Sequence, residues 1–276
     1  NSAASVRQII DLPQAGDAPA LSEQRYYNKA GILLLVSNNS VGVTIKLPGA
    51  STGITSNYTF SSYSNIYYPT NGAIVAQRTN LINGLPFLSL TNSFYDYRES
   101  KWVVPTQVDV GMLKSWLLTN TMVTTKFSSL SNVFPNIMYV ADFRTITNLH
   151  AVRLTNGIVI PTNAPSTGTN AGVATGFTVA TLNPLYVWGN YNCPNTNHLG
   201  LTNTTAAFPA SLVGDALTIL SPNWQDRTYG NGTISLDSRV AANMTVNAAI
   251  IAGTVYTFGD GGVGKFSGGV HNLPRL

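Results

Sequence analysis

Apolar residues in this chain fall mostly in short runs, separated by Gly, Asn, Ser or Pro, as is typical of β-strands. Residues Gly31–Ser37 form a continuous apolar run, and Val41–Leu47 alternates apolar and polar positions. The Asn38-Asn39-Ser40 sequence between them is typical of a turn, so the pattern predicts a hairpin. The following segment, Pro48–Pro69, has almost no charge and is predicted to be a long surface loop or a weak strand pair.

The second half of the chain is predicted to consist mainly of further strands. They share short apolar cores bounded by turn residues, and they are Ile137–Val140, Ala151–Leu154, Gly157–Ile160, Phe177–Ala180, Leu185–Trp188, Ala216–Leu220, Val246–Ile251 and Thr254–Phe258.

Helical periodicity is clearest at Val108–Leu118, where Asp109 near the start favours the helix dipole. The residues expected on its apolar face are Val110, Met112, Leu113, Trp116 and Leu117. Two weaker helices are predicted at Ala3–Ile10 and Leu21–Ala30, the second with Ser22 as its N-cap.

A strand, Gly, strand phrase occurs twice, as Leu185–Tyr191 and Ala249–Val255, each after a Thr-Val pair. The two glycines, Gly189 and Gly253, are 64 positions apart, which leaves room for about three rungs of roughly twenty residues in a stacked β-architecture. Because a Leu-Thr-Asn phrase recurs at uneven spacing, a strictly periodic solenoid is not expected. We therefore predict a mainly β protein, with a mixed α+β region at 1–136 and an irregular right-handed β-helix-like stack at 137–276; the alternative is a β-sandwich.

Charged residues make up only 9% of the chain, and uncharged polar residues take their place. Such a composition suits extracellular β-proteins, fibres and coats. Lys and Arg are scattered without a basic run, so nucleic-acid binding is not expected. The longest apolar run, Ala30–Val36, is too short to cross a bilayer. Since the chain begins at Asn1, we expect it to be a processed or truncated product.

Residues able to ligate a metal or act as nucleophiles are few and dispersed. The histidines, His150, His198 and His271, show no metal or triad spacing, and the single cysteine, Cys193, excludes an intrachain disulfide. The glycine-rich Gly259–Lys265 lacks the ending of a phosphate loop and the repeated acids of a calcium loop, and is interpreted as a turn. No metal and no cofactor are predicted.

Two other groups of residues support alternative functions. Asp215, Asp226 and Asp237 lie eleven residues apart, as in β-helical carbohydrate-active enzymes that use paired carboxylates, although their turn sequences favour capping roles. Aromatic residues in strands usually pack in the core, but four of them could form a glycan-binding surface: Trp188, Tyr191, Trp224 and Tyr229. The Asn-x-Ser/Thr sequences at Asn38, Asn57, Asn203, Asn231 and Asn243 are attributed to chance.

Several phrases of the second half, in the same order, resemble a bacterial family. They are Thr178–Thr181, Asn183–Asn192, Pro209–Ala216, Leu220–Trp224, Thr245–Ala249 and Ser267–Arg275. The family is the C-terminal β-rich domain of large, mostly uncharacterised surface proteins related to PilX-like type IV pilus assembly proteins. The resemblance implies an exported, pilus-associated or surface-exposed protein, and it supplies no catalytic residues. Because such proteins continue beyond this phrase, the C-terminus at Leu276 is expected to be trimmed.

From these observations we predict an exported structural protein of the bacterial surface and not an enzyme. It is expected to be pilus-associated or to assemble with copies of itself into an extracellular filament. A glycan-binding adhesin module and a β-helical carbohydrate-active enzyme are the alternatives, and composition alone also permits a viral coat protein. The expected partners are copies of the chain, pilus or other surface components, and glycans.

Overall fold

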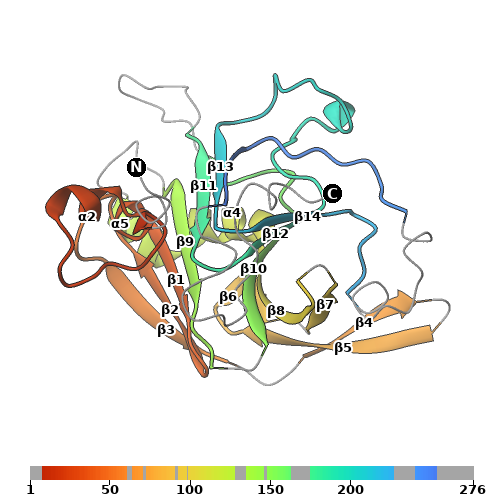
Figure 1. Cartoon of the computed structure of the whole chain (residues 1–276), viewed down its shortest axis with the longest axis horizontal. Helices are drawn as coiled ribbons and strands as arrows, with labels where there is room; N and C mark the ends of the chain where they lie inside the picture. Colours follow the sequence, from red (N-terminus) through yellow and green to blue (C-terminus); the bar gives the residue numbers. More distant parts are fainter. Residues whose placement is uncertain are drawn as a thin grey trace.

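The computed structural model describes residues 8–60, 64–70, 73–90, 93–97, 99–127, 135–145, 148–162, 175–226 and 240–253. The fold is mainly β, with two mixed sheets and few helices (Figure 1). The mainly β class predicted from the sequence is thereby confirmed.

Each sheet combines parallel and antiparallel strands. The first, sheet A, has the order β15 (Ala249–Ile251), β13 (Ala210–Val213), β11 (Phe177–Thr181), β9 (Ile137–Asp142), β1 (Ile32–Val36), β2 (Ser40–Ile45) and β3 (Ile54–Thr59). The second, sheet B, has the order β14 (Leu217–Leu220), β12 (Leu185–Trp188), β10 (Leu149–Thr155), β8 (Lys101–Asp109), β6 (Leu85–Leu90), β5 (Ala73–Ile82) and β4 (Ser64–Thr70), and β7 (Phe94–Asp96) also pairs with β8.

From β8 to β15 the chain alternates between sheet B and sheet A, and each strand from β8 to β13 pairs in parallel with the strand two places further along. In sheet B, Leu185 pairs with Val152, 33 positions earlier, and with Leu217, 32 positions later. Parallel bridges also join Tyr191 to Gly157 and to Val246, outside both sheets. Successive passages of the chain therefore pair in sheet A, in sheet B and at the isolated bridges of Tyr191.

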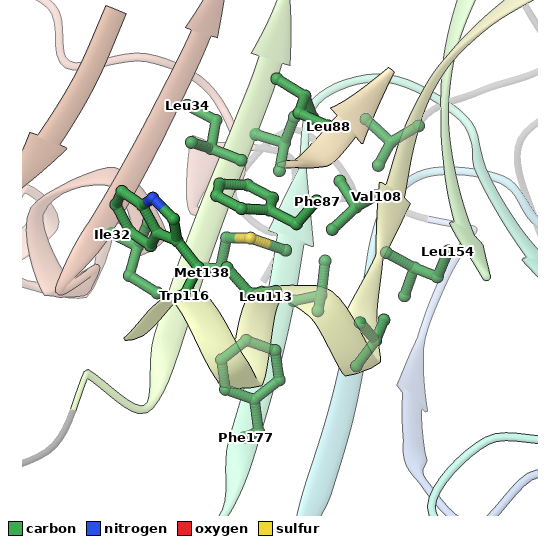
Figure 2. Packing of buried hydrophobic residues seen from close by; sticks show 14 of the residues in the cluster. Ile32, Leu34, Phe87, Leu88, Val108, Leu113, Trp116, Met138, Leu154 and Phe177 are labelled. Carbon is green, nitrogen blue, oxygen red and sulfur yellow. The ribbon is translucent and has the colours of Figure 1, made fainter. Parts of the chain in front are cut away.

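The main hydrophobic core lies between the two sheets. Leu34 and Met138 of sheet A face Phe87 and Leu154 of sheet B, and the helix α4 (Val110–Thr119) adds Trp116 to the same cluster (Figure 2). The Trp116 ring meets that of Phe87 edge to face, at 5.0 Å between centroids. A second short helix, α5 (Thr121–Phe127), adds Val123 and Phe127. Burial of this apolar surface is the main stabilising contribution to the fold.

A smaller core covers the outer face of sheet A. The helix α2 (Pro19–Gln24) lies beside sheet A in Figure 1, and the helix α3 (Tyr26–Lys29) adds Tyr26 and Tyr27 to this core. The Tyr139 hydroxyl of β9 donates a hydrogen bond of 2.6 Å to the Ile10 carbonyl, and Ile10 packs against this face. Arg25, only 2% exposed, forms an ion pair with Asp17 at 2.5 Å, which lowers the pKa of the Asp17 carboxyl. The N-terminal segment is thus fixed to sheet A.

Most of the predicted strands are confirmed, including the antiparallel hairpin of β1 and β2. Pro48–Pro69 contains β3 and most of β4, so it is a strand region and not a long loop. The strand predicted at Gly157–Ile160 is wrong: only Gly157 pairs, as an isolated bridge. Thr254–Phe258 lies outside the described residues, as do residues 3–7 of the first predicted helix.

The best predicted helix is confirmed as α4, with Asp109 as an N-cap whose carboxylate accepts a 2.8 Å hydrogen bond from the Met112 amide. Met112 was expected on the apolar face, but its side chain is 50% exposed. The helix predicted at Leu21–Ala30 is broken at the extended Arg25, and its N-cap is Ala18, not Ser22, because Pro19 occupies the first helical turn.

The repeated phrase does not mark equivalent positions. Its first copy is β12 in sheet B and its second is β15 in sheet A, although both glycines have positive φ, 79° at Gly189 and 74° at Gly253. Spacings of 32 and 33 residues also replace the predicted twenty. Both sheets contain strands from each side of residue 136, so the boundary at 136/137 separates regions of sequence within one shared core.

Candidate functional site

The outer face of sheet B carries a buried arginine, Arg153 on β10, with only 1% of its surface exposed. Its Nη1 donates a 2.6 Å hydrogen bond to Oδ1 of Asp226, and its Nε donates one of 3.0 Å to Oε1 of Gln107 on β8. The Trp224 indole N–H donates to the same Asp226 oxygen at 2.8 Å. The buried charge is therefore paired and hydrogen-bonded, as a buried guanidinium must be.

Aromatic rings enclose this ion pair. The Arg153 guanidinium lies 5.0 Å from the centre of the Trp188 ring and 5.6 Å from that of Phe94, distances typical of cation–π contacts. Phe94 meets Tyr186 and Trp224 edge to face, and the Tyr186 hydroxyl donates a 2.7 Å hydrogen bond to Asp96. The cluster attaches β7 and the segment after β14 to sheet B.

A shallow pocket of about 370 Å³ opens beside this cluster, where the chain leaves sheet B. We call it the corner pocket; it is lined by Thr155, Asn156, Ile158, Trp188, Gly189, Asn190 and Pro222. Asn156 and Gly189 have positive φ, 52° and 79°. The parallel bridge between Gly157 and Tyr191 places Asn156 beside Asn190, one passage of the chain further on.

The four aromatic residues predicted to bind glycans do not share one surface. Trp188 lines the corner pocket, and Trp224 is half-buried against Asp226 and Phe94. Tyr191 is fully buried in the main core, so its assignment to a surface is wrong; the chain turns inward after Gly189, and burial raises the pKa of its phenol. Tyr229 lies outside the described residues.

An exposed aromatic group on β7 and β8 was not predicted from the sequence. Tyr97 is 48% exposed and Trp102 is 43% exposed, and the Tyr95 ring lies edge to face against both, at 4.8 and 5.5 Å between centroids. The antiparallel pairing of Tyr95 with Trp102 creates this group. Only the cross-strand register could have revealed it, because the sequence pattern did not identify β7.

Of the carboxylates considered for catalysis, Asp226 is shown with structural partners. Asp226 accepts hydrogen bonds from Arg153 and Trp224 and is 8% exposed. Asp215 is 9% exposed in the turn between β13 and β14. Asp237 lies outside the described residues. In the ranges that the structure describes, no three His, Cys, Asp or Glu side chains gather in a way that could hold a metal ion.

His150 is the one described histidine in a buried charged cluster. Its Nδ1 lies 3.9 Å from Asp142, which also pairs with Arg144 at 2.6 Å and accepts a 2.6 Å hydrogen bond from Thr106. The amide of Asn183 bridges to the Asp142 backbone. Desolvation lowers the pKa of His150, opposed by the nearby Asp142 charge. His150 Nε2 is buried and has no hydrogen-bond partner among the described residues.

The other predicted reactive residues show no catalytic arrangement. Cys193 is buried, and its thiol donates a weak hydrogen bond of 3.6 Å to the Asn195 carbonyl. Nε2 of His198 lies 3.1 Å from Nδ2 of the Asn195 side chain. His271 and the glycine-rich Gly259–Lys265 lie outside the described residues. Among the helices of the described ranges, none has the length and apolar character required to cross a bilayer.

Comparison with known proteins yields no relative for this chain. No protein-family model matches it, and neither a curated protein nor a solved structure is significantly similar. A function for this chain must therefore be proposed from its own sequence and structure.

Proposed function

We propose that this protein is an exported structural component of the bacterial surface that assembles with copies of itself or with pilus components. The single observation that carries the proposal is the regular alternation of β8 to β15 between two sheets, with parallel pairing throughout. This topology is expected of an irregular β-helix-like stack. Parallel crossover connections are right-handed in nearly all proteins, which supports a right-handed stack.

The two ends of such a stack offer surfaces for assembly. At one end the sheets finish with β14 and β15, and at the other with β3 and β4. Within the described residues, no further strand pairs with these four. Unpaired backbone groups at a sheet edge are templates for a strand of another chain, and a head-to-tail contact that does not close yields a filament.

The β4 and β5 strands add a second feature that favours assembly. They form an antiparallel pair at the end of sheet B that extends away from the other strands of that sheet (Figure 1). Only Asn80, Leu81 and Ile82 of β5 pair with β6, so the rest of the ribbon pairs with no other described strand. A two-stranded ribbon is marginally stable alone in water, so contact with a partner would stabilise it.

Composition and family resemblance support the location. Only 9% of residues are charged, and the uncharged polar surface suits an extracellular β-protein. The phrases from Thr178 onward resemble domains of pilus-related surface proteins. No catalytic role is assigned, because Asp226, a carboxylate considered for catalysis, neutralises Arg153.

Assembly can be tested by electron microscopy and sedimentation velocity of the purified protein at increasing concentration. We expect filaments or concentration-dependent oligomers. Ala249→Lys, which places a charge on the exposed outer residue of β15, should weaken them. Thr204→Lys, at an exposed loop position, is the matched control and should assemble like the wild type. Monodisperse monomers at every concentration would refute self-assembly.

The pilus-associated form of the proposal needs a separate test in a piliated bacterium that encodes the protein. Immunogold labelling should place it on the cell surface or along pili. Labelling confined to the cytoplasm would contradict the proposed location.

A further inference from the structure

The corner pocket has a lining without charge. Its polar groups are the hydroxyl of Thr155 and the carboxamides of Asn156 and Asn190, and its only aromatic residue is Trp188. A lining of this kind offers paired hydrogen-bond donors and acceptors and one apolar ring, but no countercharge for an ionic ligand. The chemistry fits a neutral, polyhydroxylated molecule.

The lining is held in place before any ligand arrives. The Trp188 ring stacks against Arg153, whose guanidinium is fixed by Asp226 and Gln107. The Asn190 side chain accepts a 2.8 Å hydrogen bond from the Thr245 amide, and the Asn156 side chain donates one of 2.9 Å to Asp109. A preorganised site loses less conformational entropy on binding.

The pocket volume of about 370 Å³ is at the small end of the range for ligand sites. Proline-rich peptides dock in grooves lined by several aromatic rings, whereas this pocket has one. One ring and three neutral polar side chains therefore favour a ligand of one or two sugar rings over a peptide.

We propose that the corner pocket binds a neutral saccharide, with a sugar ring stacked on Trp188 and its hydroxyls bonded to Thr155, Asn156 and Asn190. This site differs from the four-residue aromatic surface expected from the sequence, because Tyr191 and Trp224 do not line it. Binding here does not depend on filament formation.

The test measures binding of the full chain to neutral glucose and N-acetylglucosamine oligosaccharides by isothermal titration calorimetry. A polyuronate and a proline-rich peptide are included as a charged ligand and a peptide ligand. We expect only the neutral oligosaccharides to bind. Gly189→Asn, which adds a side chain to a residue lining the pocket, should abolish binding: a β-carbon at Gly189 meets no heavy atom within 4 Å, and Asn tolerates a φ of 79°, so the variant should fold. Trp188→Phe, which keeps a ring over Arg153, should weaken binding about tenfold.

Trp102→Ala is the matched control, because it removes an exposed tryptophan that does not line the pocket. Its affinity should equal that of the wild type. Thermal unfolding confirms that each variant is folded. The proposal is overturned if no neutral oligosaccharide binds, if the polyuronate or the peptide binds in its place, or if Trp102→Ala abolishes binding while Gly189→Asn does not.

Discussion

Arg153 and Asp226 are 73 residues apart in the sequence, and their side chains meet in a 2.6 Å ion pair on the outer face of sheet B. The pair joins β10 to the segment that follows β14. It is nearly inaccessible to solvent, so its partners cannot be replaced by water without reorganisation.

Removal of one partner should therefore cost much more than a surface substitution. Asp226→Ala leaves the Arg153 charge buried, and we expect the free energy of unfolding to fall by about 3–5 kcal/mol in urea titrations. The double variant Arg153→Met with Asp226→Leu, which removes both charges, should recover part of this loss. Glu23→Gln, at an exposed position, should change it by less than about 0.5 kcal/mol. Equal effects at Asp226 and Glu23 would contradict a structural role for the pair.

Gly157 leaves space for the ring of Tyr191. A β-carbon at Gly157 would lie 2.5 Å from Cδ2 of Tyr191, closer than side chains approach one another. Gly157→Ala should lower the free energy of unfolding by about 1–3 kcal/mol, as overpacking does. Gly16→Ala, where nothing lies within 4 Å, should be neutral or slightly stabilising. In a Tyr191→Leu background the cost of Gly157→Ala should shrink, and a full cost there would argue against this contact.

Adjacent residues of α4 should respond very differently to truncation. Leu113 is fully buried between the sheets, whereas Met112 is 50% exposed. We expect Leu113→Ala to cost about 2–5 kcal/mol in urea unfolding. Met112→Ala should cost less than about 0.5 kcal/mol. The reverse order would mean that α4 turns its other face to the core.

The half-buried His150 predicts a loss of stability toward acid. Burial lowers its pKa below the ordinary value of 6.5, so the unfolded chain binds the proton more tightly than the folded protein does. The free energy of unfolding should therefore fall as the pH drops below 6.5 and level off below the folded pKa. Urea titrations between pH 7.5 and 5.5 measure the slope, which His150→Gln should reduce. An identical slope in both proteins would exclude His150 as its source.

Several strands of the second half, among them β9 and β12, could be predicted because they are buried on both faces. Their apolar runs, such as β9 with five buried residues of six, identify strands without showing which sheet they join. Alternation between sheets depends on the connections, which periodicity does not reveal. For this reason the sequence did not show that the two copies of the repeated phrase belong to different sheets.

The strand β8 was not predicted from the sequence. Pro105 lies within it, and proline usually argues against a central strand. Here Pro105 falls between Thr106, which pairs with Leu90 of β6, and Val103, which pairs with Phe94 of β7. The proline thus occupies the interval in which β8 passes from one partner strand to the next.

Trp188, one of the predicted binding residues, lines the corner pocket, and its environment could not be predicted from the sequence. Its stacking partner Arg153 acquires its own partners from β8 and from the segment after β14. No local pattern marks an arginine for burial when the compensating carboxylate is 73 residues away. The surface assignment of Tyr191 was wrong because two isolated bridges, to Gly157 and to Val246, hold this residue in the core, and sequence patterns do not reveal such bridges.

The position of β1 has a consequence for how the molecule is built during synthesis. β1 lies between β2 and β9 and pairs with β9 in parallel. The N-terminal hairpin is therefore complete, with one edge ready, before β9 emerges from the ribosome. Each later passage, about 32 to 46 residues long in sheet B, can then add to the edge left by the one before. Adding a strand to an existing sheet edge requires closure of only a short loop, which costs little conformational entropy. The edge formed by the strand added last lies at the end of the sheet farthest from the N-terminal hairpin.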